Sequence, residues 1–356
     1  MNNKITIATL GGHSALEIAS GAKKFHFNTL IIAQKGREKT YQKYYDHIVD
    51  EILLVDHFKE LTDKTIKNQL LEKNSIFIPH RYCQVYCDLE KLEKHFKVPI
   101  FGNKFLLRYE EREGNKNQYD LMNNASITYP KRFTDPRSID RLVLVKVSEA
   151  TRGYERAFFF ASNYQEYLIR SGELIRDKKI KREDLSTAVI EEYLIGTQVN
   201  FNFFYSPLRD KLELLGTDSR RQTNIDGLLR IPAKQQIEIE HILYPTYIES
   251  GHFAVTVKES LLEEAFALAE KLVKSTKKIV PPGIIGPFAL QTAILPGPPK
   301  EKIVVFDISL RIPGSPGTIF TPYSHYLYDR PVSFGERIAL EIRNAQKFGQ
   351  LQLITT

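Results

Sequence analysis

KITIATLGGHSALEIASGAKKF, residues 4–25, runs from a β-branched apolar segment through Gly11-Gly12-His13-Ser14 into an amphipathic segment. It predicts a strand, a glycine-containing turn and a helix, which together form the first unit of a parallel α/β sheet. Three further apolar runs alternate with helical segments, at 29–34, 52–56 and 75–80. We therefore predict a doubly wound N-terminal domain that binds ligands at the carboxyl ends of its strands, at residues 11–14 and 79–82.

The rest of the chain predicts two further α/β regions. Strands are predicted in pairs that are close in sequence, at 142–148 with 157–162, 200–206 with 211–221, and 286–294 with 302–311, and singly at 188–196. Helices are predicted at 163–172, at 258–279, where apolar residues recur every three or four positions, and at 333–348. We predict three domains, over residues 1–105, 106–196 and 197–356.

The composition favours an intracellular enzyme with anionic small-molecule substrates. The 356 residues carry a formal charge of +7, but the basic residues are scattered without a run of five, which favours phosphate-bearing substrates over nucleic acid. No apolar stretch reaches the roughly 18–20 residues that span a bilayer, and the N-terminus lacks a signal-peptide pattern. The two cysteines, Cys83 and Cys87, predict neither a disulfide framework nor a structural zinc site. We expect a cytoplasmic protein without a membrane or nucleic-acid partner.

Gln291 and Asp307 form the most informative pair of polar residues. Both lie in apolar runs, FALQ and VVFDIS, which predict neighbouring strands joined by a proline-rich turn. Carboxylate and amide oxygens are ligands for hard cations, and Mg²⁺ is often shared with substrate phosphates. Two other interpretations stay open at this point: Asp307 points to solvent, or it pairs with nearby Arg311.

Lys146 and the pair Glu191-Glu192 are candidates for nucleotide binding. Lys146 ends a predicted strand before a turn, where an ammonium group can hold phosphates. Glu191 and Glu192 end another strand, where a carboxylate could accept hydrogen bonds from an adenine amino group or from ribose hydroxyls. An exposed edge-strand lysine and exposed strand-end charges are the alternatives.

His13 and Ser14 stand at the mouth of the first strand. A glycine-containing turn that opens a helix presents backbone N–H groups to an anion. The turn lacks the full Gly-x-Gly-x-x-Gly pattern, so a dinucleotide is poorly supported and the phosphate of a smaller nucleotide fits better. The alternative is a capping turn with Ser14 at the start of the helix.

Seven strings together resemble one family across about residues 4–345. They are IATLGGHSALEI, PIFGNKFLLR, FYSPLRDKLELLG, TNIDGLLRIPAK, ESLLEEAF, PPGIIGPFALQ and VVFDISLR. The chain resembles the archaeal, formate-dependent 5-formaminoimidazole-4-carboxamide ribonucleotide synthetases of purine (IMP) biosynthesis. This resemblance implies the ATP-grasp fold, with ATP and magnesium or manganese, and suggests a homo-oligomer.

The resemblance also implies a reaction and the residues that serve it. ATP would activate formate as formyl phosphate, and the 5-amino group of 5-aminoimidazole-4-carboxamide ribonucleotide would attack it, giving the formamido ribonucleotide, ADP and phosphate. His13 falls where the family's turn contacts the ribonucleotide, with Ser14 beside it. Lys146 and Glu192 fall on the ATP-binding strand and hinge. Gln291 and Asp307 fall on the two metal-ligand positions.

Several positions depart from the family's pattern. Asp307 replaces a glutamate, and Gln222 stands where a glutamate is expected to contact ATP. Tyr82 stands where a serine often touches the ribonucleotide, and His252 replaces an asparagine near it. The phosphate loop at 149–157, EATRGYERA, holds only one glycine, whereas a glycine-dense loop would bring backbone N–H groups close to phosphates.

These departures leave three hypotheses for the function. The first is the formate-dependent ligase. The second is a divergent ATP-grasp paralogue that acts on another carboxylate or amine. The third is a nucleotide-binding subunit without catalytic activity.

Overall fold

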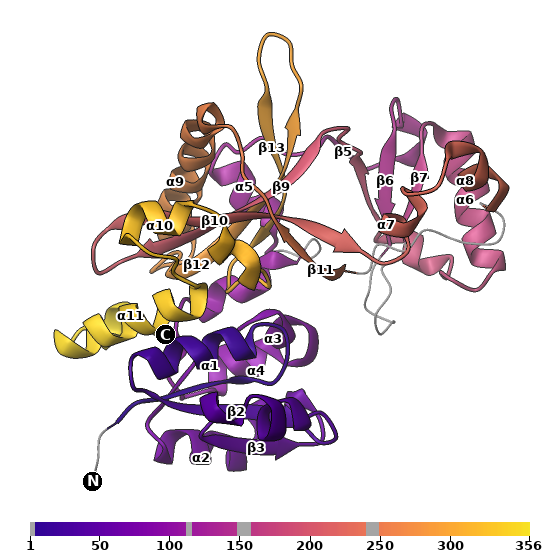
Figure 1. Cartoon of the computed structure of the whole chain (residues 1–356). Coiled ribbons are helices and arrows are strands. Elements are labelled where there is room, and N and C mark those ends of the chain that lie inside the picture. The colour runs from indigo at the N-terminus through magenta and orange to yellow at the C-terminus, as the bar shows by residue number, and fades with distance from the viewer. Residues whose placement is uncertain (1–3, 112–115, 148–157, 240–248) are drawn as a thin grey trace.

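The computed structural model describes residues 4–111, 116–147, 158–239 and 249–356, and its strands form three sheets (Figure 1). The N-terminal sheet is parallel, in the order β3-β2-β1-β4. Its strands are β1 (Thr6–Leu10), β2 (Asn28–Gln34), β3 (Glu51–Val55) and β4 (Ser75–Phe77), and its helices are α1 (Ala15–Lys24), α2 (Lys64–Glu72), α3 (Arg81–Tyr86) and α4 (Leu89–His95). This arrangement confirms the predicted doubly wound sheet, in which β1, β2 and β4 are buried on both faces and the edge strand β3 is partly exposed.

The C-terminal sheet is antiparallel, in the order β11-β10-β9-β12-β13. Its strands are β9 (Thr197–Ser206), β10 (Lys211–Gln222), β11 (Glu249–Ala254), β12 (Gly286–Leu295) and β13 (Lys302–Ser309). The two strand pairs predicted here are confirmed. The strand β11 was not predicted, because its residues are polar or exposed and show no apolar alternation.

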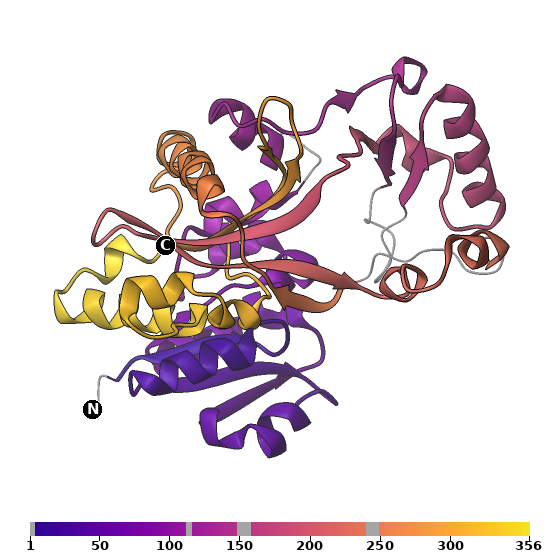
Figure 2. The same cartoon turned by 45° about the horizontal axis from the view of Figure 1, so that its top comes forward.

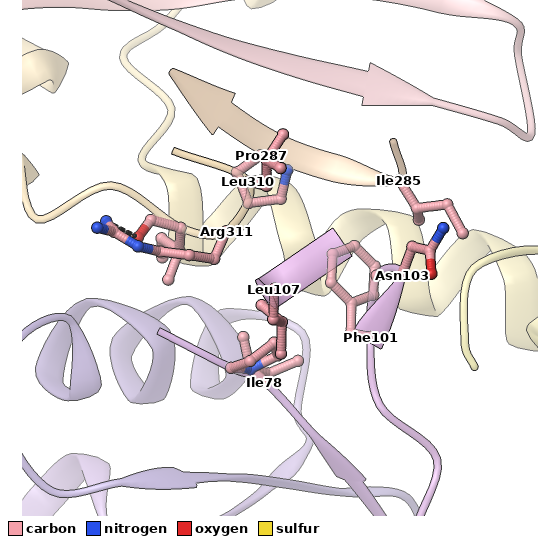
Figure 3. A pocket seen from close by; sticks show the side chains of 11 residues that line it. Ile78, Phe101, Asn103, Leu107, Ile285, Pro287, Leu310 and Arg311 are labelled. Atoms are coloured by element: carbon pink, nitrogen blue, oxygen red, sulfur yellow. Dashed lines mark hydrogen bonds between the residues drawn. The ribbon is translucent and has the colours of Figure 1, made fainter. Parts of the chain in front are cut away.

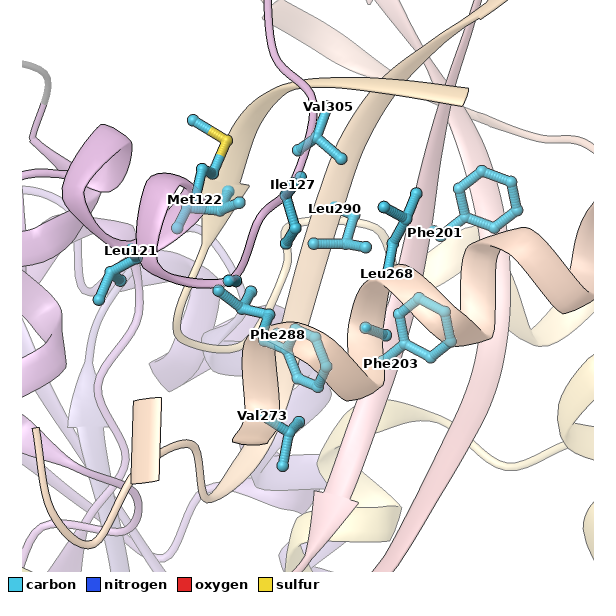
Figure 4. Close-up of a cluster of buried hydrophobic side chains, with 14 of the residues drawn as sticks. Leu121, Met122, Ile127, Phe201, Phe203, Leu268, Val273, Phe288, Leu290 and Val305 are labelled. Carbon is cyan, nitrogen blue, oxygen red and sulfur yellow. The ribbon is translucent and has the colours of Figure 1, made fainter. Parts of the chain in front are cut away.

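One face of the C-terminal sheet carries the largest apolar core. Helix α9 (Leu262–Ile279) packs its buried stripe, including Leu268 and Val273, against Phe201, Phe203 and Leu290 (Figure 4). Because side chains alternate across a strand, burying these residues turns the residues between them to the opposite face. That opposite face is the polar one on which the site is built.

The third sheet, called here the lid sheet, lies apart from the other two in both views (Figures 1 and 2). Its order is β5-β8-β6-β7, with β5 (Arg132–Phe133), β6 (Val143–Lys146), β7 (Phe158–Ala161) and β8 (Val189–Glu192), and α6 (Tyr164–Arg176) covers it. The predicted pairing of the strands at 142–148 and 157–162 is confirmed. The predicted glycine-poor loop at 149–157 lies outside the described residues. Two short helices, α7 (Ile225–Leu228) and α8 (Ala233–Ile239), follow β10 and lie on the lid side of the molecule (Figure 1).

The N-terminal and C-terminal sheets are joined by the last part of the chain. Helix α10 (Tyr323–Tyr328) leads to α11 (Phe334–Lys347), which crosses α1 so closely that a Cβ on Gly335 would lie 1.9 Å from the Glu17 carbonyl oxygen. The chain end also pairs with the N-terminal region, because Thr356 and Ile100 exchange backbone hydrogen bonds of 2.9 and 3.0 Å. We refer to these two sheets together as the body.

The edge strand β13 is covered by the segment that links the N-terminal sheet to the lid sheet. This segment holds a 3₁₀ turn at Lys104–Glu110 and helix α5 (Gln118–Asn124). The side chains of Glu110 and Gln118 accept from the N–H groups of Leu310 and Ile308, at 2.5 and 3.1 Å. These side chains thus accept hydrogen bonds from backbone N–H groups at the sheet edge, which would otherwise need water or another strand as a partner. Among the described residues, no helix is long and apolar enough to cross a membrane.

Candidate active site

Two turns at the carboxyl ends of β1 and β4 meet at one side of the site. The ring of His13, from the first turn, stacks on the ring of His80, from the second, with centroids 5.2 Å apart. Tyr82 follows His80 and packs against the first turn so closely that a Cβ on Gly12 would lie 2.2 Å from its ring. His13 has φ of 46°, a left-handed conformation that is uncommon for a residue with a side chain. The parallel sheet therefore brings together three predicted residues, His13, Ser14 and Tyr82.

His80 is neutral, and its hydrogen bonds fix its tautomer. Its Nε2 faces the carbonyl oxygen of Leu10 at 2.9 Å, which can only accept, so Nε2 carries the proton. Its Nδ1 accepts from the N–H of Tyr82 at 3.3 Å. Complete burial of the ring disfavours the charged form and lowers the pKa of His80 to about 4.

His13 is neutral as well, and its tautomer follows from Ser14. The Ser14 hydroxyl donates to the carbonyl oxygen of Pro313 at 3.1 Å, so it can only accept from His13 Nδ1, 2.6 Å away. His13 Nδ1 therefore carries the proton, and Nε2 keeps its lone pair. Desolvation by the surrounding protein, followed by repulsion from Arg311, lowers the pKa of His13 well below its ordinary value.

A row of polar side chains crosses the C-terminal sheet opposite these turns. Asp218 pairs with Asn200, Asn200 with Gln291, and Gln291 with Asp307, each directly across two neighbouring strands. Directly opposed residues share a face of the sheet, so the four side chains form one buried row. The predicted adjacency of Gln291 and Asp307 is confirmed. Asp307 is buried and does not point to solvent, and Arg311 instead lies 3.5 Å from Glu110.

His252 is charged at neutral pH, in contrast to His13. Burial opposes its charge, but hydrogen bonds to Asp218 at 2.5 Å and to Glu249 at 2.7 Å outweigh burial and raise the pKa of His252 to about 9. Asp218 is held in turn by the side-chain amides of Asn200 and Asn202, at 2.8 and 2.6 Å. The same site thus contains a neutral imidazole and an imidazolium.

Two arginines bring buried donors to the site. Arg220 donates from Nη2 to Gln291 Oε1 at 2.7 Å, and Arg311 donates from Nη1 to the carbonyl oxygen of Ile312 at 3.1 Å. The Nε groups of both are buried and complete no hydrogen bond within the described residues, although Glu249 and Glu110 lie 3.3 and 3.5 Å away. Unmet buried donors of this kind suit the oxygens of a bound phosphate.

A small apolar pocket lies beneath Arg311, between the two sheets of the body. In Figure 3, Ile78 and Leu107 from the N-terminal side face Pro287 and Leu310 from the C-terminal sheet, and the Arg311 side chain extends away to one side. Apolar packing on this side excludes water from the arginine. Charge interactions across the site are therefore weakly screened.

Gln291 and Asp307 can supply oxygen ligands to a divalent cation. Gln291 Oε1 already accepts from Arg220, but a carbonyl oxygen has a second lone pair. The described residues contain no cluster of three or more His, Cys, Asp or Glu side chains that could hold a metal alone. Two protein oxygens fit an ion such as Mg²⁺, which keeps several waters and binds through substrate phosphates.

The lid sheet presents Lys146 in a buried ion pair. Its ammonium group contacts Glu191, and the hydroxyl of Tyr119, from α5, donates to the other oxygen of the same carboxylate. Glu192, which was predicted to bind ATP, points to the other side of β8, accepts from the Lys131 N–H at 3.2 Å and pairs with Arg141 at 3.1 Å. Lys146 therefore pairs with Glu191, and not with Glu192, the residue that was predicted to bind ATP.

Gln222 ends β10 on the side of the lid sheet and does not join the group around His13. Its backbone N–H donates to Asp226, at the start of α7, at 3.1 Å. His252 reaches the group around His13 through Ser315, whose hydroxyl lies 3.1 Å from His252 Nδ1, because the preceding residue, Gly314, lies against the His13 ring. Of the predicted residues, the structure thus groups His13, Ser14 and Tyr82 with His252, and pairs Gln291 with Asp307. Lys146, Glu192 and Gln222 lie toward the lid.

Sequence reasoning missed most of the polar and charged residues around these groups. They are Arg81, Glu110, Tyr119, Asp218, Arg220, Glu249 and, as a site residue, Arg311. In the sequence, Arg220 and Arg221 counted only among the scattered basic residues, and nothing indicated that Arg220 belongs to the site. Asp218 is buried, but its neighbours Thr217, Ser219 and Arg220 are polar, so no local apolar pattern could have marked it as a site residue.

Comparisons with known proteins cover almost the whole chain. Residues 7–133 match a family described as "Protein of unknown function (DUF1246)", and residues 166–356 match a "Domain of unknown function (DUF1297)". Proteins of Methanocaldococcus jannaschii and Methanothermobacter thermautotrophicus are each 39% identical over 99% of this chain and 95% and 94% of their own lengths. Both are named 5-formaminoimidazole-4-carboxamide-1-(beta)-D-ribofuranosyl 5'-monophosphate synthetase.

Solved structures give the same picture. The IMP biosynthesis protein PurP of Thermococcus kodakaraensis is 26% identical, with a TM-score of 0.72 over 98% of this chain and 100% of that chain. An N5-carboxyaminoimidazole synthetase of Staphylococcus aureus, complexed with ADP, is 15% identical, with a TM-score of 0.63 over 95% of this chain and 76% of that one, and shows the fold alone. These likenesses confirm the predicted ATP-grasp fold.

Proposed function

The chain belongs to the 5-formaminoimidazole-4-carboxamide ribonucleotide synthetases, and from this premise we propose that it is an ATP-dependent ligase that formylates an amino ribonucleotide. Formate and ATP give formyl phosphate and ADP. The 5-amino group of 5-aminoimidazole-4-carboxamide ribonucleotide then displaces phosphate to give the formamido product, a step of IMP biosynthesis. The names of the relatives agree with this hypothesis and give no support to a paralogue with other substrates or to a subunit without activity.

The observation that carries the proposal is the set of donors between the two sheets of the body. The buried Nε groups of Arg220 and Arg311 and the charged ring of His252 belong to one site with the neutral ring of His13. Guanidinium and imidazolium groups in a weakly screened site favour phosphate oxygens. We assign the ribonucleotide to this site, with His13, Ser14, Tyr82 and His252 as its contacts.

We assign ATP to the side of the lid sheet, with Lys146, Glu192 and Gln222 as candidate contacts. Lys146 is 12% exposed and held by Glu191, so its ammonium group is already oriented before a nucleotide arrives. A pre-oriented cation loses less conformational freedom on binding than a free lysine does. Of the pair Glu191-Glu192 considered from the sequence, Glu191 is the one that contacts Lys146, so it joins Glu192 as a candidate on this side.

Gln291 and Asp307 would hold the divalent cation between the two substrates. A divalent cation held by these two oxygens would neutralise phosphate oxygens, which would favour transfer of the phosphoryl group to formate. We propose Mg²⁺, with Mn²⁺ as a substitute, because the ligands are oxygens. Asp307→Asn keeps the shape of the side chain but removes its charge, and we expect it to raise the concentration of Mg²⁺ needed for half-maximal activity.

An assay with ATP, formate, Mg²⁺ and the amino ribonucleotide tests the proposed function. Release of ADP should require all three substrates, and the formamido ribonucleotide should form in equal amount. Leaving out formate gives the matched control. No formate-dependent release of ADP above the background would contradict the proposal.

Assembly and location are proposed from the family resemblance alone. We propose a homo-oligomer in the cytoplasm, and we retain domain boundaries near residues 105 and 196 as a proposal. Light scattering of the purified chain measures the oligomeric state directly. A mass equal to the 41.1 kDa monomer at micromolar concentration would exclude a stable homo-oligomer.

A further inference from the structure

The Nε2 atom of His13 is an accessible base within the proposed ribonucleotide site. Nδ1 donates to the Ser14 hydroxyl, and that hydroxyl donates to the carbonyl oxygen of Pro313. The lone pair of the His13 ring therefore lies on Nε2. His13 is exposed by surface area although the protein atoms packed around its ring desolvate it, and no described group donates a hydrogen bond to Nε2. The stacked ring of His80 restrains the imidazole, and Nε2 lies beside Gly314, where a Cβ would be 2.8 Å away.

The other titratable groups in the site are already engaged. His252 is protonated and has no lone pair to offer. Asp218 and Glu249 accept from His252, and Glu110 accepts from the N–H of Leu310 and lies beside Arg311. A general base must be unprotonated, must have a lone pair that is not already engaged, and must lie within reach of the substrate. Asp307 is assigned to the divalent cation, so among these described groups His13 is the one that meets these conditions.

We propose that His13 Nε2 accepts the proton from the substrate amine during formyl transfer, an inference that rests on the proposed function. The amine nitrogen forms a bond to the carbon of formyl phosphate. The bond from that carbon to the phosphate oxygen breaks, and phosphate leaves with the electron pair. The proton lost from nitrogen moves to Nε2 and from there to water, so that His13 is neutral again for the next cycle.

The charges that face His13 match this role. Desolvation, then Arg311, His80, Arg81 and His252, lower the pKa of His13 and keep it neutral before substrate binds. An anionic ribonucleotide would offset the arginines and raise that pKa toward neutrality. The base would therefore become strongest when its substrate is present.

Transfer can be measured apart from activation by supplying formyl phosphate directly, with ADP, Mg²⁺ and the amino ribonucleotide. For His13→Asn, we expect the transfer rate at saturating ribonucleotide to fall by about 10²- to 10⁴-fold. Added imidazole should restore part of the rate. In wild type, the rate should fall on the acid side of the pH profile, and this limb should be absent in the variant.

Gly314→Ala offers a second test without changing a titratable group. The new methyl group would lie 2.8 Å from His13 Nε2 and should slow transfer while leaving the KM for ATP unchanged. Gly317→Ala is the matched control, since nothing lies within 4 Å of its added Cβ, and it should keep the wild-type rate. Thermal unfolding of each variant checks that the fold is kept.

The outcomes separate the two proposals. If wild type forms no formamido ribonucleotide, the proposed function is wrong. If wild type forms it and His13→Asn keeps more than a tenth of the transfer rate at saturating ribonucleotide, His13 only binds substrate and the inference is overturned. A variant that loses transfer without imidazole rescue, and keeps the wild-type acid limb, overturns it as well.

Discussion

The crossing of α1 and α11 and the junction of the lid sheet are two contrasting ways of joining parts of this chain. At the crossing, Gly21 and Gly335 bring two helix backbones into direct contact, and a buried arginine network lies close by in α11. At the junction, Tyr119 of α5 reaches the lid sheet through side-chain contacts only: its hydroxyl donates to Glu191, and its ring lies against the guanidinium of Arg132. A backbone contact cannot yield without separating the helices, whereas one hydroxyl can be lost while the lid sheet stays folded. Substitutions in the body should therefore cost stability, and substitutions at the junction should change nucleotide binding.

Gly335→Ala should have the largest effect. Its Cβ would lie 1.9 Å from the carbonyl oxygen of Glu17, an atom of backbone that cannot rotate away. The helices must separate, and we expect a loss of more than about 4 kcal/mol in the free energy of unfolding or no soluble protein at all. Urea denaturation measures the effect.

Gly172→Ala in α6 is the control for that substitution. It is also a glycine within a helix, but nothing lies within 4 Å of its added Cβ. Alanine has the higher helix propensity, so this variant should be more stable by about 0.5–1 kcal/mol. Equal effects at the two glycines would contradict the close-contact explanation.

Arg337→Ala should rank second. Arg337 is fully buried, donates to Glu213 at 2.7 Å and to Glu341 at 2.8 Å, and stacks on Phe204. Removing it leaves two carboxylates buried without their cation, for which we expect a loss of about 3–5 kcal/mol. The triple variant that adds Glu213→Gln and Glu341→Gln should recover part of this loss, and no recovery would show that the charges are not the cause.

The sequence predicted the apolar framework of both regions better than their polar contacts. Strands such as TLIIAQ, residues 29–34, can be predicted because burial requires a continuous run of apolar residues. Arg311 and Glu110 are 201 positions apart, and no local pattern records their ion pair. Glu191 and Glu192 differ only in which face of β8 they occupy, which depends on the register with β6.

Glu17→Gln should produce a pH-dependent effect at the crossing. Burial raises the pKa of Glu17 from 4.5 to about 7, although its carboxylate accepts from the N–H of Phe334 at 2.9 Å. Because the pKa is higher in the folded state, the stabilising contribution is complete below about pH 4.5 and is lost as the pH rises through 7. Between pH 5 and 8.5, wild type should lose at most about 3 kcal/mol relative to the glutamine variant. A difference in unfolding free energy that stays constant with pH would exclude this role.

Tyr119→Phe should have the smallest effect on stability and a selective effect on nucleotide. The substitution removes the hydroxyl that holds Glu191 and keeps the ring under the Arg132 guanidinium, 4.0 Å from its centroid. Glu191 then orients Lys146 less firmly, and we expect the KM for ATP to rise about 3- to 10-fold, the equivalent of roughly one hydrogen bond. The KM for the amino ribonucleotide should not change, because its proposed site lies in the body.

Tyr129→Phe provides the control that decides between a local and a general effect. Tyr129 packs on Tyr119 with ring centroids 5.4 Å apart, but its hydroxyl donates to Asn123 and not to the lid sheet. Loss of this hydroxyl should leave both KM values at their wild-type levels. If both tyrosine variants raise the KM for ATP equally, packing of α5 explains the effect and the contrast between hydroxyl and backbone contacts fails. If only Tyr119→Phe does so, the lid junction acts on nucleotide binding through Glu191 and Lys146.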